Sequence, residues 1–210
     1  RARVAGDPDP VGKAILMISE AERPVMVAGS GTFYSMVGPS EHPFTGQLSS
    51  LLKAFSETAG VPIVTPIWDR GVVDEPWDTF FGVVGAASGE SAILERADLI
   101  VLLGADVDYR TNYLDVPPLL PGRRIIRVDA DPVHLHQGVT PHVGIVADPG
   151  ILLEHWSGLW VSAYRTHDAW LDSVRELHGS FYRRWDEVAI PVPEGSLTGR
   201  DVVDTLGRVL

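Results

Sequence analysis

The sequence predicts a three-layer α/β domain, Rossmann-like, around a sheet of six parallel strands. Six short apolar segments rich in Val, Ile and Leu recur along the first 150 residues, and helices or loops separate them. Segments of this kind are typical of strands buried on both faces in a parallel sheet that helices cover. Most of the six are followed at once by glycine or aspartate. Because parallel strands end at one edge, we expect these residues where such sheets bind ligands.

The composition fits a folded domain and excludes several function classes. The chain has 210 residues, 45% of them hydrophobic, and 17 Lys and Arg against 28 Asp and Glu give a formal net charge of −11. This acid excess disfavours nucleic acids and anionic membrane surfaces as partners. The absence of cysteine excludes disulfides, thiol nucleophiles and Cys-ligated metals. No apolar run is long enough to span a bilayer, so we expect no membrane partner and a cytoplasmic location.

The elements alternate in the order that such a sheet requires. In order, we expect a linker over 1–10, helix 11–21, strand 24–28, loop 32–46, helix 47–59, strands 61–65 and 79–84, helix 90–97, and strands 99–103, 124–128 and 143–146. The helix over 47–59 has apolar residues at i, i+3, i+4 and i+7 from Leu48 to Phe55. Strand 99–103 (LIVLL) is the clearest buried strand.

The pattern changes after the sixth strand. We expect residues 11–150 to form the central domain and 151–190 a helical extension without strands. A helical stripe in that extension consists of Trp170, Val174, Leu177, Phe181 and Trp185. Residues 191–210 are expected to be a linker and a helix, which Thr198 and Asp201 open as a capping box.

The apolar face of this last helix allows two interpretations. Its residues are Val202, Val203, Leu206 and Val209. A chain that begins at Arg1 rather than Met is expected to be a piece of a longer protein, and the helix would then belong to a further domain. In the other interpretation, the helix folds back on the sheet.

Small and acidic residues at the strand ends are the candidate ligand site. Glycine lets backbone N–H groups approach a phosphate, and an aspartate after a later strand can accept hydrogen bonds from ribose hydroxyls. The candidates are Gly29, Ser30, Gly31, Gly82, Gly85, Gly104, Asp106, Asp129, Asp131 and Asp148. Turn geometry alone can also explain each glycine, and Asp129 and Asp131 can also cap a helix that begins near Pro132. The layout predicts a cleft for a dinucleotide or an adenine nucleotide.

Motifs for catalysis and metal binding are missing from the sequence. His134 and His136 are two residues apart, a spacing that does not place them on one helix face. The sequence has no H-E-x-x-H, no G-x-S-x-G and no Walker loop. We therefore expect no catalytic residue and no metal site in this chain.

Five segments resemble the central domain of thiamine-diphosphate-dependent enzymes of the acetolactate synthase and 2-oxo acid decarboxylase type. They are 21–31 (AERPVMVAGSG), 59–65 (AGVPIVT), 97–104 (ADLIVLLG), 125–132 (IIRVDADP) and 145–148 (IVAD). The resemblance implies a mainly structural domain, inactive alone, in a parent enzyme that acts on 2-oxo acids. Thiamine diphosphate and Mg would then bind between the amino-terminal and carboxy-terminal domains of a homodimeric or homotetrameric parent. Residues 191–210 would lead into the carboxy-terminal, pyrophosphate-binding domain.

The same resemblance leaves FAD or ADP as possible ligands of the strand ends, and the chain departs from the FAD-binding pattern. FAD-binding members have G-G-G at Gly29–Gly31, G-M-H-G at Gly82–Gly85, and an arginine at Asp106. Arg110 could replace that arginine only in a different geometry. We therefore expect no cofactor in this chain, and the alternative is a self-contained module that binds FAD, NAD or ADP.

Overall fold

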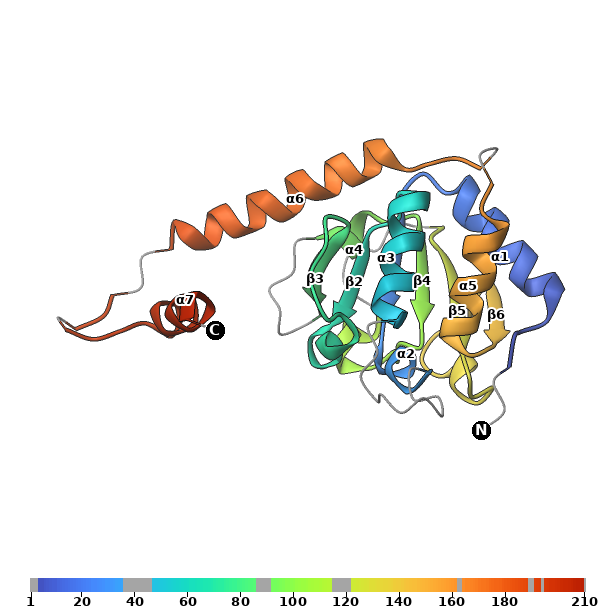
Figure 1. The fold of residues 1–210 in the computed structure, drawn as a ribbon, viewed down its shortest axis with the longest axis horizontal. Coiled ribbons are helices and arrows are strands. Elements are labelled where there is room, and N and C mark those ends of the chain that lie inside the picture. Colours follow the sequence, from blue (N-terminus) through green and yellow to red (C-terminus); the bar gives the residue numbers. More distant parts are fainter. Residues whose placement is uncertain are drawn as a thin grey trace.

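Six parallel strands form one sheet at the centre of the molecule (Figure 1). The structure is a computed structural model, and it describes residues 4–35, 47–85, 92–114, 122–161, 164–188, 191–193 and 195–209. The strands are β1 (Pro24–Ala28), β2 (Ile63–Pro66), β3 (Phe80–Val84), β4 (Leu99–Leu103), β5 (Arg124–Asp129) and β6 (Val143–Val146). Their order is β3-β2-β1-β4-β5-β6, and each neighbouring pair is parallel. The predicted fold class is confirmed.

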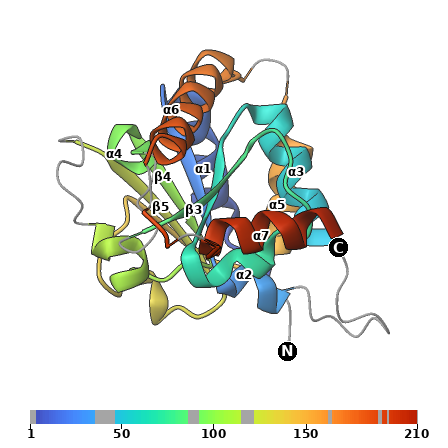
Figure 2. The ribbon, with the colours of Figure 1, turned by 90° about the vertical axis from the view of Figure 1, so that its left-hand side faces the viewer.

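Helices cover both faces of this sheet, as Figure 2 shows. The helices are α1 (Pro8–Glu20), α2 (Ser30–Ser35), α3 (Gln47–Ala59), α4 (Ile93–Arg96), α5 (Pro149–Leu159), α6 (Asp168–Asp186) and α7 (Gly199–Val209). Three short 3₁₀ turns are η1 (Ile67–Val72), η2 (Tyr109–Leu114) and η3 (His134–His136). Helices α1, α3 and α5 lie on one face, and α4 and the first half of α6 lie on the other.

Successive side chains of β4 pack alternately into two hydrophobic cores, one on each face of the sheet. Leu99, Val101 and Leu103 pack with the helices α1, α3 and α5. Ile100 and Leu102 pack on the opposite face, against α4 and α6. All five side chains are fully buried. A strand that must be apolar on both faces produces the uninterrupted apolar run seen in the sequence.

Helix α1 begins three residues earlier than its apolar period predicts. Asp7 is its N-cap, and the Asp7 side chain accepts a hydrogen bond from the Asp9 N–H at 3.0 Å. Pro8 is the first helical residue, where proline loses no hydrogen bond. The last three residues of the expected linker 1–10 are therefore the first turn of the helix.

The segment after β1 also differs from the expected loop 32–46. Residues 30–35 form the short helix α2, and the rest of that range lies outside the described residues. Helix α3 has the predicted bounds, whereas β2 begins at Ile63 rather than at residue 61. Proline at position 62 cannot donate to a strand ladder, which explains the later start.

The predicted helical stripe lies on α6 and is buried only in the first half of that helix. Trp170 and Val174 pack into the core beside α4, and the Trp170 Nε1–H donates to the carbonyl oxygen of Pro24 at 2.9 Å. Farther along, Tyr182 and Trp185 are exposed, and the helix continues past the end of the sheet at β3 (Figure 1).

Helix α7 stands apart from the sheet (Figure 1). Its predicted capping box is present, because Thr198 N–H donates to Asp201 Oδ2 at 2.7 Å and Asp201 N–H donates to Thr198 Oγ1 at 3.1 Å. The four apolar side chains of its face are exposed: Val202, Val203, Leu206 and Val209. The interpretation in which this helix folds back on the sheet is wrong for this structure.

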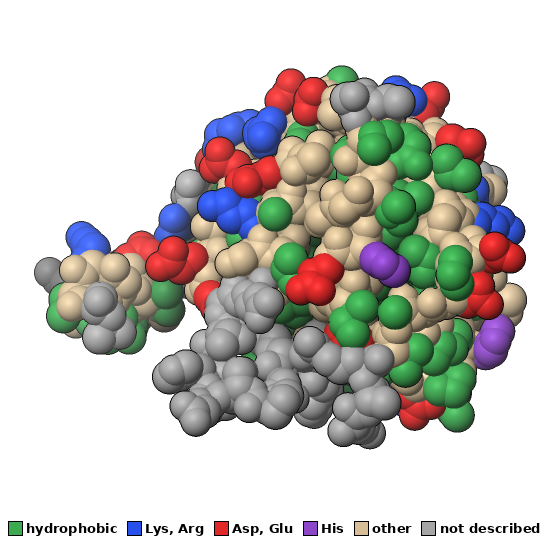
Figure 3. Space-filling view, turned by 45° about the vertical axis from the view of Figure 1, so that its right-hand side comes forward, with side chains coloured by type: hydrophobic (Ala, Val, Ile, Leu, Met, Phe, Trp, Pro, Cys, Tyr) green, Lys and Arg blue, Asp and Glu red, His purple; other side chains and the backbone are tan. Residues whose placement is uncertain are grey.

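The described surface carries no membrane-crossing element and no uniform charge on the face that Figure 3 displays. Within the described residues, every helix is too short or too polar to cross a membrane. On the displayed face, basic and acidic side chains are interspersed among hydrophobic ones.

Candidate functional site

The strand order reverses between β1 and β4, and this reversal places the candidate site. In open parallel sheets, ligands bind outside the carboxyl ends of the strands at such a point. Here the two strand ends contact each other directly. The Gly29 N–H donates to the Leu103 carbonyl at 3.0 Å, and the Gly31 N–H donates to the Gly104 carbonyl at 2.8 Å.

Close approach of these two backbones accounts for the glycines. A Cβ atom on Gly29 would lie 2.4 Å from the Ala105 Cα, and a Cβ on Gly31 would lie 2.7 Å from the Gly104 Cα. Gly104 has φ +56°, and its Cβ would lie 2.6 Å from the Thr32 nitrogen. The missing side chains thus make room for the neighbouring strand end.

A buried carboxylate that the sequence analysis did not single out lies beside these glycines. Asp69 of η1 is 6% exposed, and its Oδ2 accepts a hydrogen bond from the Ser30 N–H at 3.0 Å. In a nucleotide cleft, an N–H in this position is available to a phosphate. The only local signal was an aspartate soon after a predicted strand, which also occurs at many ordinary turns.

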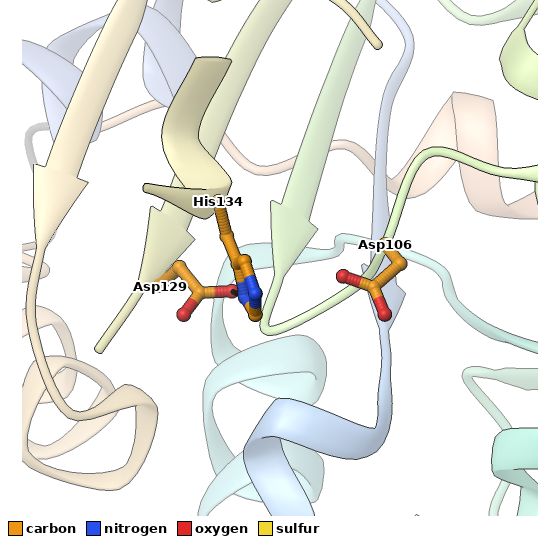
Figure 4. A group of neighbouring side chains, drawn as sticks. All are labelled: Asp106, Asp129 and His134. Carbon is orange, nitrogen blue, oxygen red and sulfur yellow. Dashed lines mark hydrogen bonds and ion pairs between the residues drawn. The ribbon is translucent and has the colours of Figure 1, made fainter. Parts of the chain in front are cut away.

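Acidic residues and a histidine gather at the ends of β4 and β5 (Figure 4). One ligand atom from each of Asp106, Asp129 and His134 lies within 4.8 Å of the others. Asp129 Oδ1 accepts from the Asp131 N–H at 2.8 Å, while its Oδ2 lies 3.4 Å from His134 Nδ1. Figure 4 shows the imidazole between the two carboxylates.

A buried arginine lies beneath this cluster. Arg127 is 1% exposed, and its Nη1 donates to the Gln137 carbonyl. Burial lowers the pKa of Arg127, whereas the charges of Asp129 and Asp106 raise it. The guanidinium therefore compensates part of the negative charge of the two carboxylates.

Two of the candidate aspartates have capping roles. Asp148 is the N-cap of α5, and its Oδ1 accepts from the N–H groups of Gly150 at 2.9 Å and Ile151 at 3.2 Å. Asp131 Oδ1 accepts from the Val133 N–H at 2.9 Å in the turn before η3. These bonds account for both residues without a ligand.

Gly82 and Gly85 belong to the β3 end of the sheet, two strands away from β1. Gly82 lies inside β3 with φ +78° rather than after the strand, and a Cβ there would face His178 of α6 at 3.9 Å. Gly85 follows β3 with φ +120°. Arg110 lies in η2, and its side chain is outside the described part of the structure.

The strand order of the parallel sheet and the helices on both of its faces define an α/β domain of the Rossmann-like class. The family model described as "Thiamine pyrophosphate enzyme, central domain" matches residues 11–156. The chain belongs to this family, and the resemblance noted in the sequence is confirmed.

Two relatives agree with this assignment, and a solved structure shares the fold. The chain is 29% identical over 203 residues to the acetolactate synthase large subunit of Corynebacterium glutamicum, covering 94% of this chain and 30% of the relative. It is 27% identical over 141 residues to glyoxylate carboligase of Escherichia coli O157:H7, covering 66% of this chain and 22% of the relative. Benzoylformate decarboxylase from Polynucleobacter necessarius shares the fold, with a TM-score of 0.61 and 22% identity. The match covers 81% of this chain and 30% of the decarboxylase. The chain thus spans about a third or less of each protein.

Proposed function

We propose that this chain is the structural central domain of a longer thiamine-diphosphate-dependent enzyme that acts on 2-oxo acids, as acetolactate synthases do, and that it is inactive alone. Acetolactate synthase and glyoxylate carboligase among the relatives support this class of reaction. The chain spans 30% of the acetolactate synthase subunit, so most of such a parent lies outside it. Mg and a dimeric or tetrameric parent stay predictions from the family resemblance, and a cytoplasmic location stays a prediction from the sequence.

Thiamine diphosphate, FAD and ADP share a diphosphate that these strand ends do not suit. The observation that carries this proposal is the hydrogen bond from the Ser30 N–H to the Asp69 carboxylate. In a nucleotide site, a phosphate oxygen would accept a hydrogen bond from an N–H in this position. Asp106 and Asp129 add negative charge on the β4 and β5 side, which repels a diphosphate. Any role for this chain in the parent's chemistry would therefore be to hold other domains in place.

Helix α7 is part of the same proposal. Its exposed face of valine and leucine, joined to the sheet through a proline-containing linker, is suited to pack against a following domain. An exposed apolar helix face of this kind marks an interaction surface. We assign residues 191–210 to the passage into that domain.

A thermal-shift titration of the full chain tests whether the strand ends bind a nucleotide. FAD, ADP and NAD are each added at about 100 times a micromolar dissociation constant, where binding would stabilise the fold by about 2.7 kcal/mol. We expect no change in the melting temperature with any of the three. A saturable rise of several degrees would instead support the self-contained nucleotide-binding module.

A second experiment separates the scaffold role from an enzyme complete in itself. The chain is incubated with pyruvate, thiamine diphosphate and Mg, and acetolactate and carbon dioxide are measured. We expect no product from the chain alone and product from the parent polypeptide that contains it. Turnover by the chain alone would contradict the proposal.

A further inference from the structure

We propose that Arg123 is the anchor of a binding site for an oxyanion, a carboxylate or a phosphate group, at the amino-terminal end of β5. Arg123 directly precedes β5, whereas the candidate site described above lies at the carboxyl ends of the strands. Asp129 is six positions farther along the chain, and at about 3.3 Å per residue the two positions are about 20 Å apart. The new site is therefore distinct from the candidate site, and it does not depend on the proposed function.

The alternation of side chains along β5 places Arg123 on one face of the sheet. Ile125 packs in the core beside α4 and α6. The Arg124 N–H donates to the Asp98 carbonyl at 2.9 Å, so β5 is already paired with the chain before β4 at this level. Because side chains two positions apart share a face, Arg123 lies on the face of Ile125. Arg124 lies on the opposite face, where its Nη1 is 3.9 Å from Oε2 of Glu20 in α1.

The guanidinium of Arg123 is buried without a partner. Arg123 is 9% exposed, and its Nε, Nη1 and Nη2 atoms all lack a hydrogen-bond partner in the described structure. A charge that is buried in this way destabilises the fold, because nothing replaces the hydration that it loses. An oxyanion can accept two parallel N–H bonds from one guanidinium, and the opposite charge stabilises both groups. The free donors of Arg123 therefore point to an anionic ligand.

Electrostatics distinguish Arg123 from the other buried arginine of this strand. Burial lowers the pKa of Arg123 to about 10, and no acidic group of the described chain counteracts this shift. The guanidinium still carries its charge at neutral pH. Arg127 also has two nitrogen atoms without a partner, but the carboxylates of Asp129 and Asp106 raise its pKa. Those carboxylates repel an anion from Arg127, so Arg123 is the position where an anion is favoured.

Access to Arg123 comes from the turn that precedes it. Gly122 is exposed, and among the described residues nothing lies within 4 Å of the position that a Cβ atom would take there. Arg123 is the next residue, and its long side chain can bring the guanidinium to this surface by rotation. Two sources of the same chemistry fit the site. One is a free oxyanion, and the other is an acidic side chain from the part of the parent that lies outside this chain.

Thermal unfolding of the full chain in Tris chloride tests the site, with phosphate or acetate added and sodium chloride of equal ionic strength as the reference. We expect each oxyanion to raise the Tm by about 3–5 °C at about ten times a millimolar dissociation constant. Arg123→Met should abolish this rise. In buffer without oxyanion, the same variant should unfold at a higher temperature than the unchanged chain, because it lacks the buried charge.

Arg124→Met is the matched control, because Arg124 is the adjacent arginine on the opposite face and has Glu20 beside it. This variant should keep the full rise with phosphate. Should Arg123→Met fail to fold, Arg123→Gln makes the same comparison with a polar side chain that carries no charge. Circular dichroism of each variant without added oxyanion shows that it is folded.

The parent polypeptide distinguishes the two sources. If the natural ligand is a free oxyanion, phosphate should raise the Tm of the parent as it does that of the chain. If an acidic side chain of another domain already pairs with Arg123, phosphate should have no effect on the parent, and Arg123→Met should lower its Tm.

Three results on the chain itself would overturn the site. They are a rise with sodium chloride as large as that with phosphate, an equal rise in the Arg123→Met and unchanged chains, and no rise with either oxyanion up to about 100 mM.

Discussion

The buried carboxylate of Asp69 accepts a hydrogen bond from the Ser30 N–H, and this bond joins the turn after β2 to the first residue of α2. The two residues are 39 positions apart. The chain thereby places its own negative charge where related sheets place a ligand's phosphate. This contact therefore links the negative charge at the candidate site to the stability of the fold.

Replacing Asp69 with alanine should destabilise the protein by about 1–3 kcal/mol, because the partly buried Ser30 N–H loses its acceptor. Urea unfolding followed by circular dichroism measures the change. Asp78→Ala is the control, since Asp78 is exposed, and it should change stability by less than about 0.5 kcal/mol. Equal stability of the two variants would mean that the Ser30 contact contributes nothing.

Replacing Gly104 with alanine should cost more than about 2 kcal/mol, because it adds a clash with the Thr32 backbone to a left-handed φ of +56°. Gly12→Ala makes the same chemical change inside α1, where nothing lies within 4 Å of the new Cβ. That control should gain about 0.5–1 kcal/mol. Denaturant midpoints compare the two, and a harmless Gly104→Ala would contradict the close contact of β1 and β4.

Replacing Trp170 with phenylalanine should cost about 1–3 kcal/mol, because the Pro24 carbonyl loses its indole donor and the smaller phenyl ring leaves part of the buried indole volume unfilled. Trp185→Phe is the matched control on the same helix, because Trp185 is 54% exposed. Its effect should stay within about 0.5 kcal/mol. Thermal unfolding measures both, and a similar loss in both variants would show that α6 packs along its whole length.

Acidification should destabilise the protein through His167, whose pKa is lowered by burial and then by Arg165, although Asp98 and Asp168 act in the opposite direction. The unfolded chain therefore takes up a proton more readily than the folded one. The contribution is intact above the unfolded value of about 6.5 and is lost as the pH falls through the lower folded value. His167→Gln should flatten the fall in stability between about pH 7 and pH 5.

Exposed His136 provides the control for this pH experiment. His136→Gln should leave the pH profile of urea unfolding unchanged. If His167→Gln keeps the full slope of the unchanged chain, another group causes the acid sensitivity.

The strands could be predicted from sequence because each is apolar by itself. Residues 24–28 and 99–103 have the bounds of β1 and β4, since burial on both faces leaves no polar position to blur the limits. Helix α3 was equally clear, because its period of apolar residues is local. These elements could be predicted without knowing which residues lie beside them in the folded protein.

The site was harder to predict because its contacts join distant segments. Nothing near Asp69 shows that it will meet Ser30, and nothing near Asp106 shows that it will meet His134. His134 and His136 are near each other in sequence, whereas the side chains that lie beside His134 in the structure, Asp106 and Asp129, come from other strand ends. Gly82 was counted among the strand ends although it lies inside the predicted strand 79–84, and the structure places it within β3.

The irregular backbone of β3 has a consequence for how this protein avoids aggregation. An edge strand with free N–H and C=O groups is a template for another chain, and native proteins interrupt such templates. Gly82, with φ +78°, breaks the extended run of β3, and the pairing register with β2 shifts at the same level. Phe81 packs edge-on against His178 of α6, with ring centroids 5.5 Å apart. Because β3 is bent and packs against α6, another strand cannot form a regular ladder of hydrogen bonds with it. This edge of the sheet therefore resists fibril-like growth.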